Sequence, residues 1–170
     1  MKNPALSHIG FTLVEVLIVM AIFASLVGVA TFGTFSQIRK GVLEATTDEV
    51  IATIREAQTK AMGGDTAGSS SSQYFGVYFD TKSYTLFKGY NYVPTDSYNF
   101  KVNLDNNLIF SSISLPSCSD SYANRCVVFL RVSGEVHLFD QAVNRFTLKD
   151  TQTGKEVSFT INQLGVINAQ

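Results

Sequence analysis

Residues 11–38 read FTLVEVLIVMAIFASLVGVATFGTFSQI, and Glu15 is the only charged residue among them. A helix over residues 11–35 would be roughly 37 Å long at about 1.5 Å per residue. This length exceeds the thickness of a bilayer's hydrocarbon core, which is about 30 Å. We therefore predict a transmembrane helix at residues 11–35, preceded by a short leader at residues 1–10.

The composition outside this run is that of a folded domain with balanced charge. The chain has 170 residues, of which 45% are hydrophobic, and a formal net charge of −1. This hydrophobic fraction excludes a disordered chain, and the net charge excludes a highly basic nucleic-acid binder. Two cysteines are too few for a disulfide-rich scaffold or a four-cysteine zinc site.

Neither a secretory signal peptide nor a plain signal anchor explains the carboxylate of Glu15 inside the apolar run. A secretory signal peptide has an apolar run of only about 7–15 residues, although Gly28-Val29-Ala30 would pass as its cleavage site. A plain signal anchor has the right length but gives no reason for a carboxylate, which is costly inside a membrane and requires a partner. Lys2 is distant in the leader, whereas cleavage just before Phe11 would create a new α-amino group close to Glu15.

The string Gly10-Phe11-Thr12-Leu13-Val14-Glu15 resembles the cleavage and methylation site of type IV prepilins and pseudopilins. In that family a prepilin peptidase cuts after the glycine and methylates the new N-terminal phenylalanine. The glutamate then pairs with the N-terminus of a neighbouring subunit. The resemblance implies cleavage after Gly10, methylation of Phe11, and a role in assembly for Glu15 together with Thr12. One departure is the leader, where His8 and Ile9 stand in place of the usual Lys or Arg.

A second, amphipathic helical segment is predicted at residues 36–62. Its apolar positions recur at steps of three or four and form one stripe: Leu43, Thr47, Val50, Ile54, Ala57 and Ala61. Gly63-Gly64 should end the helix. Residues 63–72, rich in Gly and Ser, are predicted to form a flexible loop.

The remaining residues, 73–170, are predicted to form a β-rich head. Eight segments rich in aromatic or β-branched residues predict strands: 74–80, 84–90, 108–112, 127–132, 135–139, 146–149, 156–161 and 165–167. Short turn sequences predict hairpins between the first two, between 127–132 and 135–139, and between 146–149 and 156–161. The fold class is therefore α+β, with the long N-terminal helix packed on a mainly antiparallel sheet.

The β-rich head resembles the H-type minor pseudopilins of type II secretion and their pilus relatives, the GspH/FimT-like group. The late-helix string at residues 54–61 (IREAQTKA) and the terminal Gly165-Val166-Ile167 are similar to that group. This resemblance implies a minor pilin or pseudopilin with a single-pass inner-membrane helix and an exported C-terminal domain. Its implied partners are the prepilin peptidase, other pilin subunits and the lipid bilayer.

No enzymatic site is predicted, because His137 has no accompanying nucleophile motif and no cofactor or metal motif is present. Asn103, Asp105, Asn106 and Asn107 could offer oxygen ligands to calcium, but their spacing favours a turn. Cys118 and Cys126 both lie in the exported part, where oxidation is permitted, and we predict a disulfide between them.

Two alternatives to the pilin interpretation stay open: a DNA-binding pilus subunit for uptake, and an unprocessed membrane-anchored binding domain. We expect no nucleic-acid partner, because no Lys or Arg follows Lys155. A basic patch could still form in three dimensions from Arg125, Arg131, Arg145 and Lys149.

Overall fold

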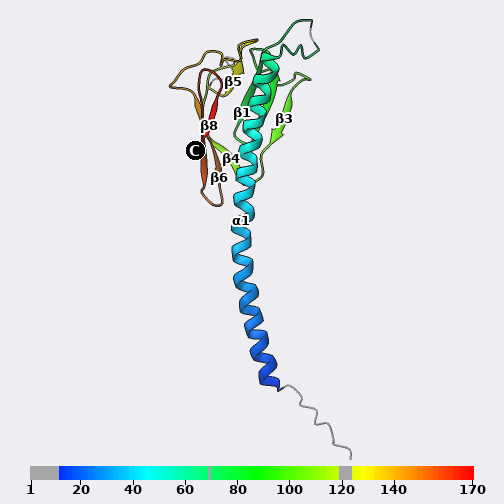
Figure 1. The fold of residues 1–170 in the computed structure, drawn as a ribbon, viewed down its shortest axis with the longest axis vertical. Coiled ribbons are helices and arrows are strands. Elements are labelled where there is room, and N and C mark those ends of the chain that lie inside the picture. The colour runs from blue at the N-terminus through cyan, green and yellow to red at the C-terminus, as the bar shows by residue number, and fades with distance from the viewer. Residues whose placement is uncertain (1–11, 69, 119–123) are drawn as a thin grey trace, which may run out of the picture. The chain divides into compact units, whose positions relative to one another are not determined.

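The computed structural model describes residues 12–68, 70–118 and 124–170, and for residues 30–40 it describes the backbone only. Helix α1 runs from Leu13 to Met62 and is followed by eight strands (Figure 1). The chain divides into two compact units, residues 1–42 and residues 43–170. We call residues 43–170 the C-terminal unit; it contains the end of α1 and all eight strands.

Local chemistry accounts for the end of α1. The chain leaves the helix directly after Met62, and Gly64 adopts a φ of +71°, a left-handed conformation that glycine reaches without strain. The N–H of Gly63 donates to the carbonyl of Thr59 at 2.8 Å, and the N–H of Asp65 donates to the carbonyl of Lys60 at 3.1 Å. These bonds satisfy two of the carbonyls that a helix end leaves without partners.

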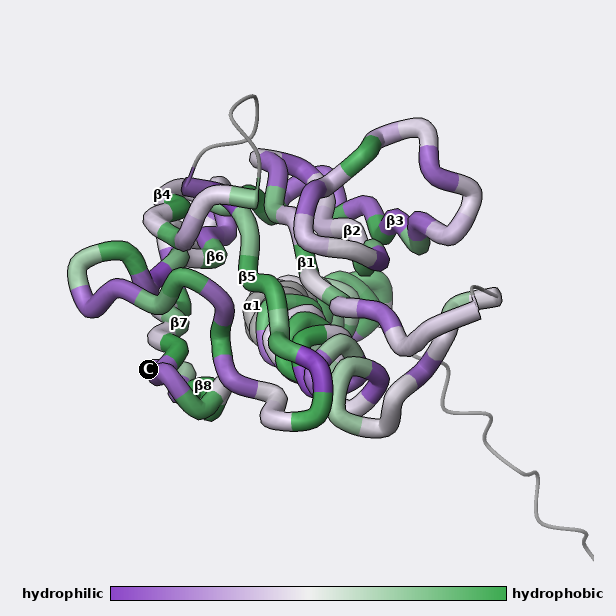
Figure 2. Tube along the Cα trace, turned by 90° about the horizontal axis from the view of Figure 1, so that it is seen from above, coloured by the Kyte–Doolittle hydropathy of each residue, from purple (hydrophilic) through white to green (hydrophobic). Residues whose placement is uncertain are grey.

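The predicted apolar stripe of α1 is the helical part of the core. Leu43, Val50, Ile54, Ala57 and Ala61 are buried in one cluster with residues of both sheets. The charged and polar positions between them, such as Glu44, Asp48 and Arg55, are exposed. In Figure 2, where α1 is seen end-on, β1 and β5 border it.

The strands form two four-stranded sheets. The first has the order β3-β2-β1-β5 and the second has the order β4-β6-β7-β8. All of these neighbouring strands pair antiparallel, which confirms the α+β fold class. The bounds are β1 Phe75–Asp80, β2 Ser83–Lys88, β3 Phe100–Asn103, β4 Leu108–Ser114, β5 Cys126–Phe129, β6 Arg145–Asp150, β7 Glu156–Ile161 and β8 Ile167–Ala169.

The two sheets meet through aromatic side chains. Phe146 on β6 stacks on Phe159 of β7, with ring centroids 4.5 Å apart, and lies 4.5 Å from the ring of Phe79 on β1. Phe79 also meets Phe110 of β4 edge-on at 5.3 Å. All four side chains are buried. Phe79 therefore contacts two rings of the second sheet, and its contact with Phe146 is one of those that join the sheets.

The prediction of a strand at residues 135–139 is wrong. The segment makes one isolated bridge, from Val136 to Phe129, and no ladder. Positive φ angles at Val132, Gly134 and Leu138 turn the backbone repeatedly, so the alternation of a strand cannot continue. The same turns stop β5 at Phe129 rather than at residue 132.

Two further strands differ from the sequence prediction. Strand β3, Phe100–Asn103, was not predicted, although its residues alternate between apolar and polar; it is a four-residue edge strand and is mostly exposed. The last strand begins at Ile167, because Gly165 (φ +78°) lies in a turn closed by its N–H to the carbonyl of Asn162.

Gln58 ties α1 to two distant turns. Its side-chain amide donates to the carbonyls of Gly134 at 2.9 Å and Leu164 at 2.8 Å. A Cβ atom at Gly165 would collide with the Gln58 amide and the ring of Phe129, so glycine permits this close approach. The turn before β8 is thereby held against the last turns of the helix.

Candidate functional site

The start of α1 carries the described part of the predicted processing motif. The Thr12 hydroxyl and carbonyl accept the Glu15 N–H at 3.3 Å and 3.1 Å, and the carbonyl also accepts the Val16 N–H at 3.2 Å. Thr12 is thus the N-cap of the helix, and Glu15 lies in the first turn, where a negative charge is favourable. The spacing Thr-x-x-Glu is a helix-start signature in the sequence that our prediction had not used.

Gly10 and Phe11, the predicted cleavage and methylation pair, lie outside the described residues. Glu15 is exposed on the helix, and its carboxylate takes part in none of the ion pairs formed within the described part of the chain. Its immediate neighbours Val14 and Val16 are apolar. The carboxylate therefore sits on an apolar surface without an ionic partner among the described side chains.

The helix around Glu15 exposes a long apolar surface. Its large hydrophobic side chains are all exposed to solvent in the single chain: Leu13, Val14, Val16, Leu17, Ile18, Val19, Met20, Ile22, Phe23, Leu26, Val27 and Val29. Among the residues that the structure describes, no helix has both the length and the hydropathy required to cross a membrane. The predicted span at residues 11–35 also includes positions whose side chains fall outside the description.

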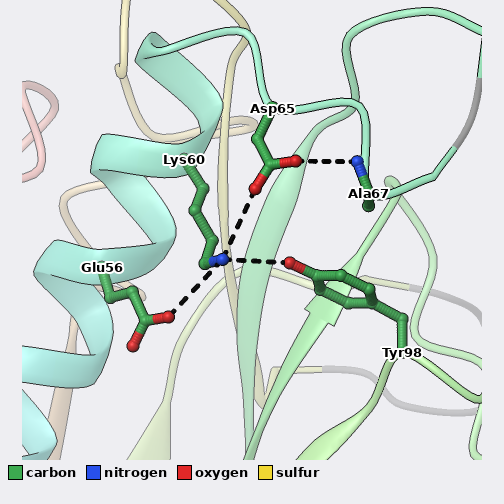
Figure 3. Close-up of polar contacts among 5 residues, drawn as sticks. All are labelled: Glu56, Lys60, Asp65, Ala67 and Tyr98. Atoms are coloured by element: carbon green, nitrogen blue, oxygen red, sulfur yellow. Dashed lines mark hydrogen bonds and ion pairs between the residues drawn. The ribbon is translucent and has the colours of Figure 1, made fainter.

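A polar cluster fixes the loop that follows α1 (Figure 3). The Lys60 ammonium contacts Glu56 at 3.7 Å, Asp65 at 3.4 Å and the Tyr98 hydroxyl at 3.2 Å. The hydrogen bond to Tyr98 is the main cause that raises the pKa of Lys60, partly opposed by burial. The N–H of Ala67 donates to Asp65 at 2.8 Å and is the main cause that lowers the pKa of that carboxyl. The cluster joins the helix end to two loops, which is a structural role.

In the described part of the chain, His137 contacts an aromatic ring. Its ring lies beside Tyr90, with centroids 5.0 Å apart, in the turn segment that replaces the predicted strand. Within residues 12–68, 70–118 and 124–170, no group of three His, Cys, Asp or Glu side chains could hold a metal ion.

The possible calcium ligands near residue 105 form a turn. The Asp105 carboxylate accepts the N–H of Asn107 at 3.1 Å, and its carbonyl accepts the N–H of Leu108 at 3.0 Å. Asn107 accepts bonds from Gln152 and Thr151. The Asp105 oxygens thus close the turn before β4, and the Asn107 oxygens join this turn to the one between β6 and β7.

Cys118 and Cys126 are joined by a disulfide, with Cα atoms 5.6 Å apart. Both residues are buried against Phe87 and Val128 on the face of the first sheet that points away from the main core. The bridge closes the loop between β4 and β5.

We expect the protein, when it is purified and denatured without reductant, to show no titratable thiol. Closing so short a loop stabilises the fold by about 2–3 kcal/mol in the chain-entropy model. The measurement is a thiol count on the denatured chain, with a reduced sample as the control. Two reactive thiols in the non-reduced sample would exclude the bond.

The four cations of the possible basic patch do not share one environment. Arg125 pairs with Asp80 at 3.1 Å, and Lys149 pairs with Glu156 at 2.6 Å. Arg131 donates to the carbonyl of Ser72 at 3.1 Å. Arg145 and Lys149 belong to β6 of the second sheet, whereas Arg125 and Arg131 flank β5 of the first. Two of the four charges are thus already neutralised within the chain.

Comparison with known proteins gives one match. Residues 7–31 match the family model described as the prokaryotic N-terminal methylation motif. No curated protein and no solved structure matches the chain. The matched residues contain Gly10, Phe11, Thr12 and Glu15, which were the site residues predicted at this end of the chain.

Proposed function

We propose that this chain is a prepilin-like subunit that is cleaved after Gly10, methylated on Phe11 and assembled into a filament. The observation that carries the proposal is the methylation-motif match at residues 7–31. Two features of the described helix support it: the carboxylate of Glu15 lies on an otherwise apolar surface, and that surface is exposed over Leu13–Val29. Exposed apolar area of this extent requires cover from lipid or from other protein.

The apolar surface of this helix can be covered first by lipid and later by other subunits. Before assembly, the apolar surface would lie in the membrane, with the C-terminal unit on the exported side. In a filament, the same surface would pack against copies or homologues and stay away from water. The cost of the Glu15 charge would fall when it pairs with the α-amino group of a neighbouring subunit.

The finer assignment is to a minor pilin or pseudopilin of the H-type group, in type II secretion or a type IV pilus. It is supported by the sequence resemblances at residues 54–61 and 165–167 and by a head built mainly of strands. The cation pairs at Arg125 and Lys149 favour this structural role over DNA uptake, because DNA affinity depends on unpaired cations meeting phosphates.

Intact mass tests the processing step directly. In a host with an active prepilin peptidase, we expect the membrane-extracted protein to lack residues 1–10 and to carry one methyl group on Phe11. Gly10→Val should block the cut, because it replaces the leader-side residue of the junction.

Gly28→Val is the matched control for this variant. A Cβ atom added at Gly28 meets nothing within 4 Å, so the change adds the same side chain without altering the junction. Processing of Gly28→Val should be complete. A full-length mass for the wild-type chain in the same host would refute the proposal.

A further inference from the structure

An open groove of about 400 Å³ lies beyond the C-terminal end of β5. It is lined by one cation, three hydroxyl-bearing side chains and two aliphatic side chains: Arg131, Ser72, Tyr74, Ser133, Leu130 and Val132. The N–H of Val132 donates to the carbonyl of Ala61 at 3.2 Å, which places the groove beside the last turn of α1. Its volume lies within the usual range for small-ligand sites, about 300–1,000 Å³.

Arg131 is held in place but has no ionic partner in the described chain. Its Nη1 donates to the carbonyl of Ser72 at 3.1 Å, and its guanidinium lies 4.6 Å from the centre of the Tyr74 ring. Arg125, at the other end of β5, is paired with Asp80, whereas none of the ion pairs among the described residues includes Arg131. The remaining N–H donors of this fixed guanidinium can meet both oxygens of one carboxylate.

The chemistry of the groove favours a single carboxylate over a nucleic acid or a stacked ring. Arg131 is the one cation among the described lining residues, whereas nucleic-acid affinity comes from several cations that neutralise successive phosphates. The Tyr74 ring already contacts the guanidinium of Arg131 and the ring of Tyr90, whose centroid is 3.7 Å away. It is therefore not an open platform on which a base or a sugar could stack.

The wall of the groove beside Arg131 is aliphatic and exposed. Val132 is a β-branched residue with a φ of 67°, which is strained, and 79% of its surface is exposed. Leu130 is half-buried next to it. The Ser133 hydroxyl accepts the N–H of Glu135 at 3.3 Å, which leaves its own proton for a ligand oxygen. A ligand that suits this groove carries a carboxylate next to an apolar group.

We propose that the groove at Arg131 binds the C-terminal end of another polypeptide, one whose last residue is aliphatic. The guanidinium of Arg131 takes the terminal carboxylate, Ser133 donates to a carboxylate or amide oxygen, and Val132 and Leu130 cover the last side chain. A chain end suits an open groove because it is mobile and carries one full charge directly beside its last side chain. The inference goes beyond the proposed filament function and does not depend on it.

Peptide titrations on the purified full chain test the site. The probe is the tetrapeptide Gly-Gly-Ala-Val with a neutral fluorophore on its N-terminus, and its binding to the chain in neutral detergent is followed by fluorescence anisotropy. We expect saturable binding of the free acid and binding of the C-terminal amide that is weaker by about tenfold or more. Replacing the last valine of the peptide by glycine should weaken binding severalfold, because the apolar contact with Val132 is lost.

Variants of the chain assign the binding to Arg131. Arg131→Gln should weaken binding of the free acid by about tenfold and bring it close to that of the amide. Arg131→Lys keeps the charge but loses the two-pronged contact, so its affinity should be intermediate. Arg145→Gln is the matched control and should leave the affinity unchanged. Arg145 is an exposed cation on β6 of the other sheet, and it forms none of the ion pairs among the described residues.

The comparison of acid with amide uses the wild-type chain, so it does not depend on the folding of any variant. The inference is overturned if neither peptide binds, if acid and amide bind equally, or if Arg131→Gln leaves the affinity unchanged. It is also overturned if acetate or inorganic phosphate displaces the probe as well as unlabelled Gly-Gly-Ala-Val does, because the groove would then bind small anions in general. None of these outcomes depends on cleavage after Gly10, so they leave the proposed function untouched.

Discussion

Phe146→Ala is expected to lower the free energy of unfolding of the C-terminal unit by about 3–5 kcal/mol, the usual cost of removing a buried aromatic side chain. Phe146 is fully buried and contacts the rings of Phe79 and Phe159, so the change opens a cavity between the two sheets. Domains are stable by only about 5–15 kcal/mol in total. The loss should lower the unfolding midpoint by about 10–20 °C.

Phe100→Ala is the matched control, because it makes the same chemical change on the edge strand β3, where the side chain is 63% exposed. Its effect should stay within about 0.5 kcal/mol. Thermal melts of the full chain in detergent, followed by near-ultraviolet circular dichroism, compare the two. Equal midpoints for both variants would show that the two sheets do not depend on the Phe146 contact.

Glu15→Val is expected to leave membrane insertion intact, or to improve it, while sharply lowering incorporation into filaments. Insertion improves because the cost of burying a carboxylate disappears. Incorporation falls because the new N-terminus of a neighbour loses its ionic partner. A tenfold fall would correspond to about 1.4 kcal/mol per contact.

Leu17→Val serves as the control for this change, since it keeps the same exposed apolar surface and leaves the carboxylate in place. Crosslinking to neighbouring subunits in isolated membranes and in sheared filaments measures the two steps separately. Normal incorporation of the valine variant would refute the pairing role of Glu15.

The helix could be predicted because the sequence pattern that specifies it lies within the helix and at its ends. The stripe from Leu43 to Ala61 repeats with the period of a helix, and Gly63-Gly64 marks its end, so burial and boundary both follow from spacing alone. The N-cap at Thr12 could also have been read from its spacing to Glu15.

The strands were less predictable, because tertiary contacts decide where they begin and end. Residues 135–139 alternate as a strand would, yet the chain turns at Val132 and Gly134 to pack on the end of α1. Strand β3 has an alternating sequence but is only four residues long and mostly exposed, so its pattern is short. The contact between Ser72 and Arg131 was equally hidden, because the two residues are far apart in the sequence and meet only in the fold.

The bonds of Gln58 have a consequence for how the chain folds. The side-chain amide of this helical residue donates hydrogen bonds to the carbonyls of Gly134 and Leu164. Leu164 is 106 residues further along the chain. Contacts of such long range slow folding, because the entropy of closing the loop is lost before the contact forms. Helix α1 precedes all the strands that bury its stripe, and the Gln58 bonds form only after residues 134 and 164 have been made. Under the proposed function, in which the C-terminal unit is exported, the stripe must be kept from aggregating until those residues have crossed the membrane.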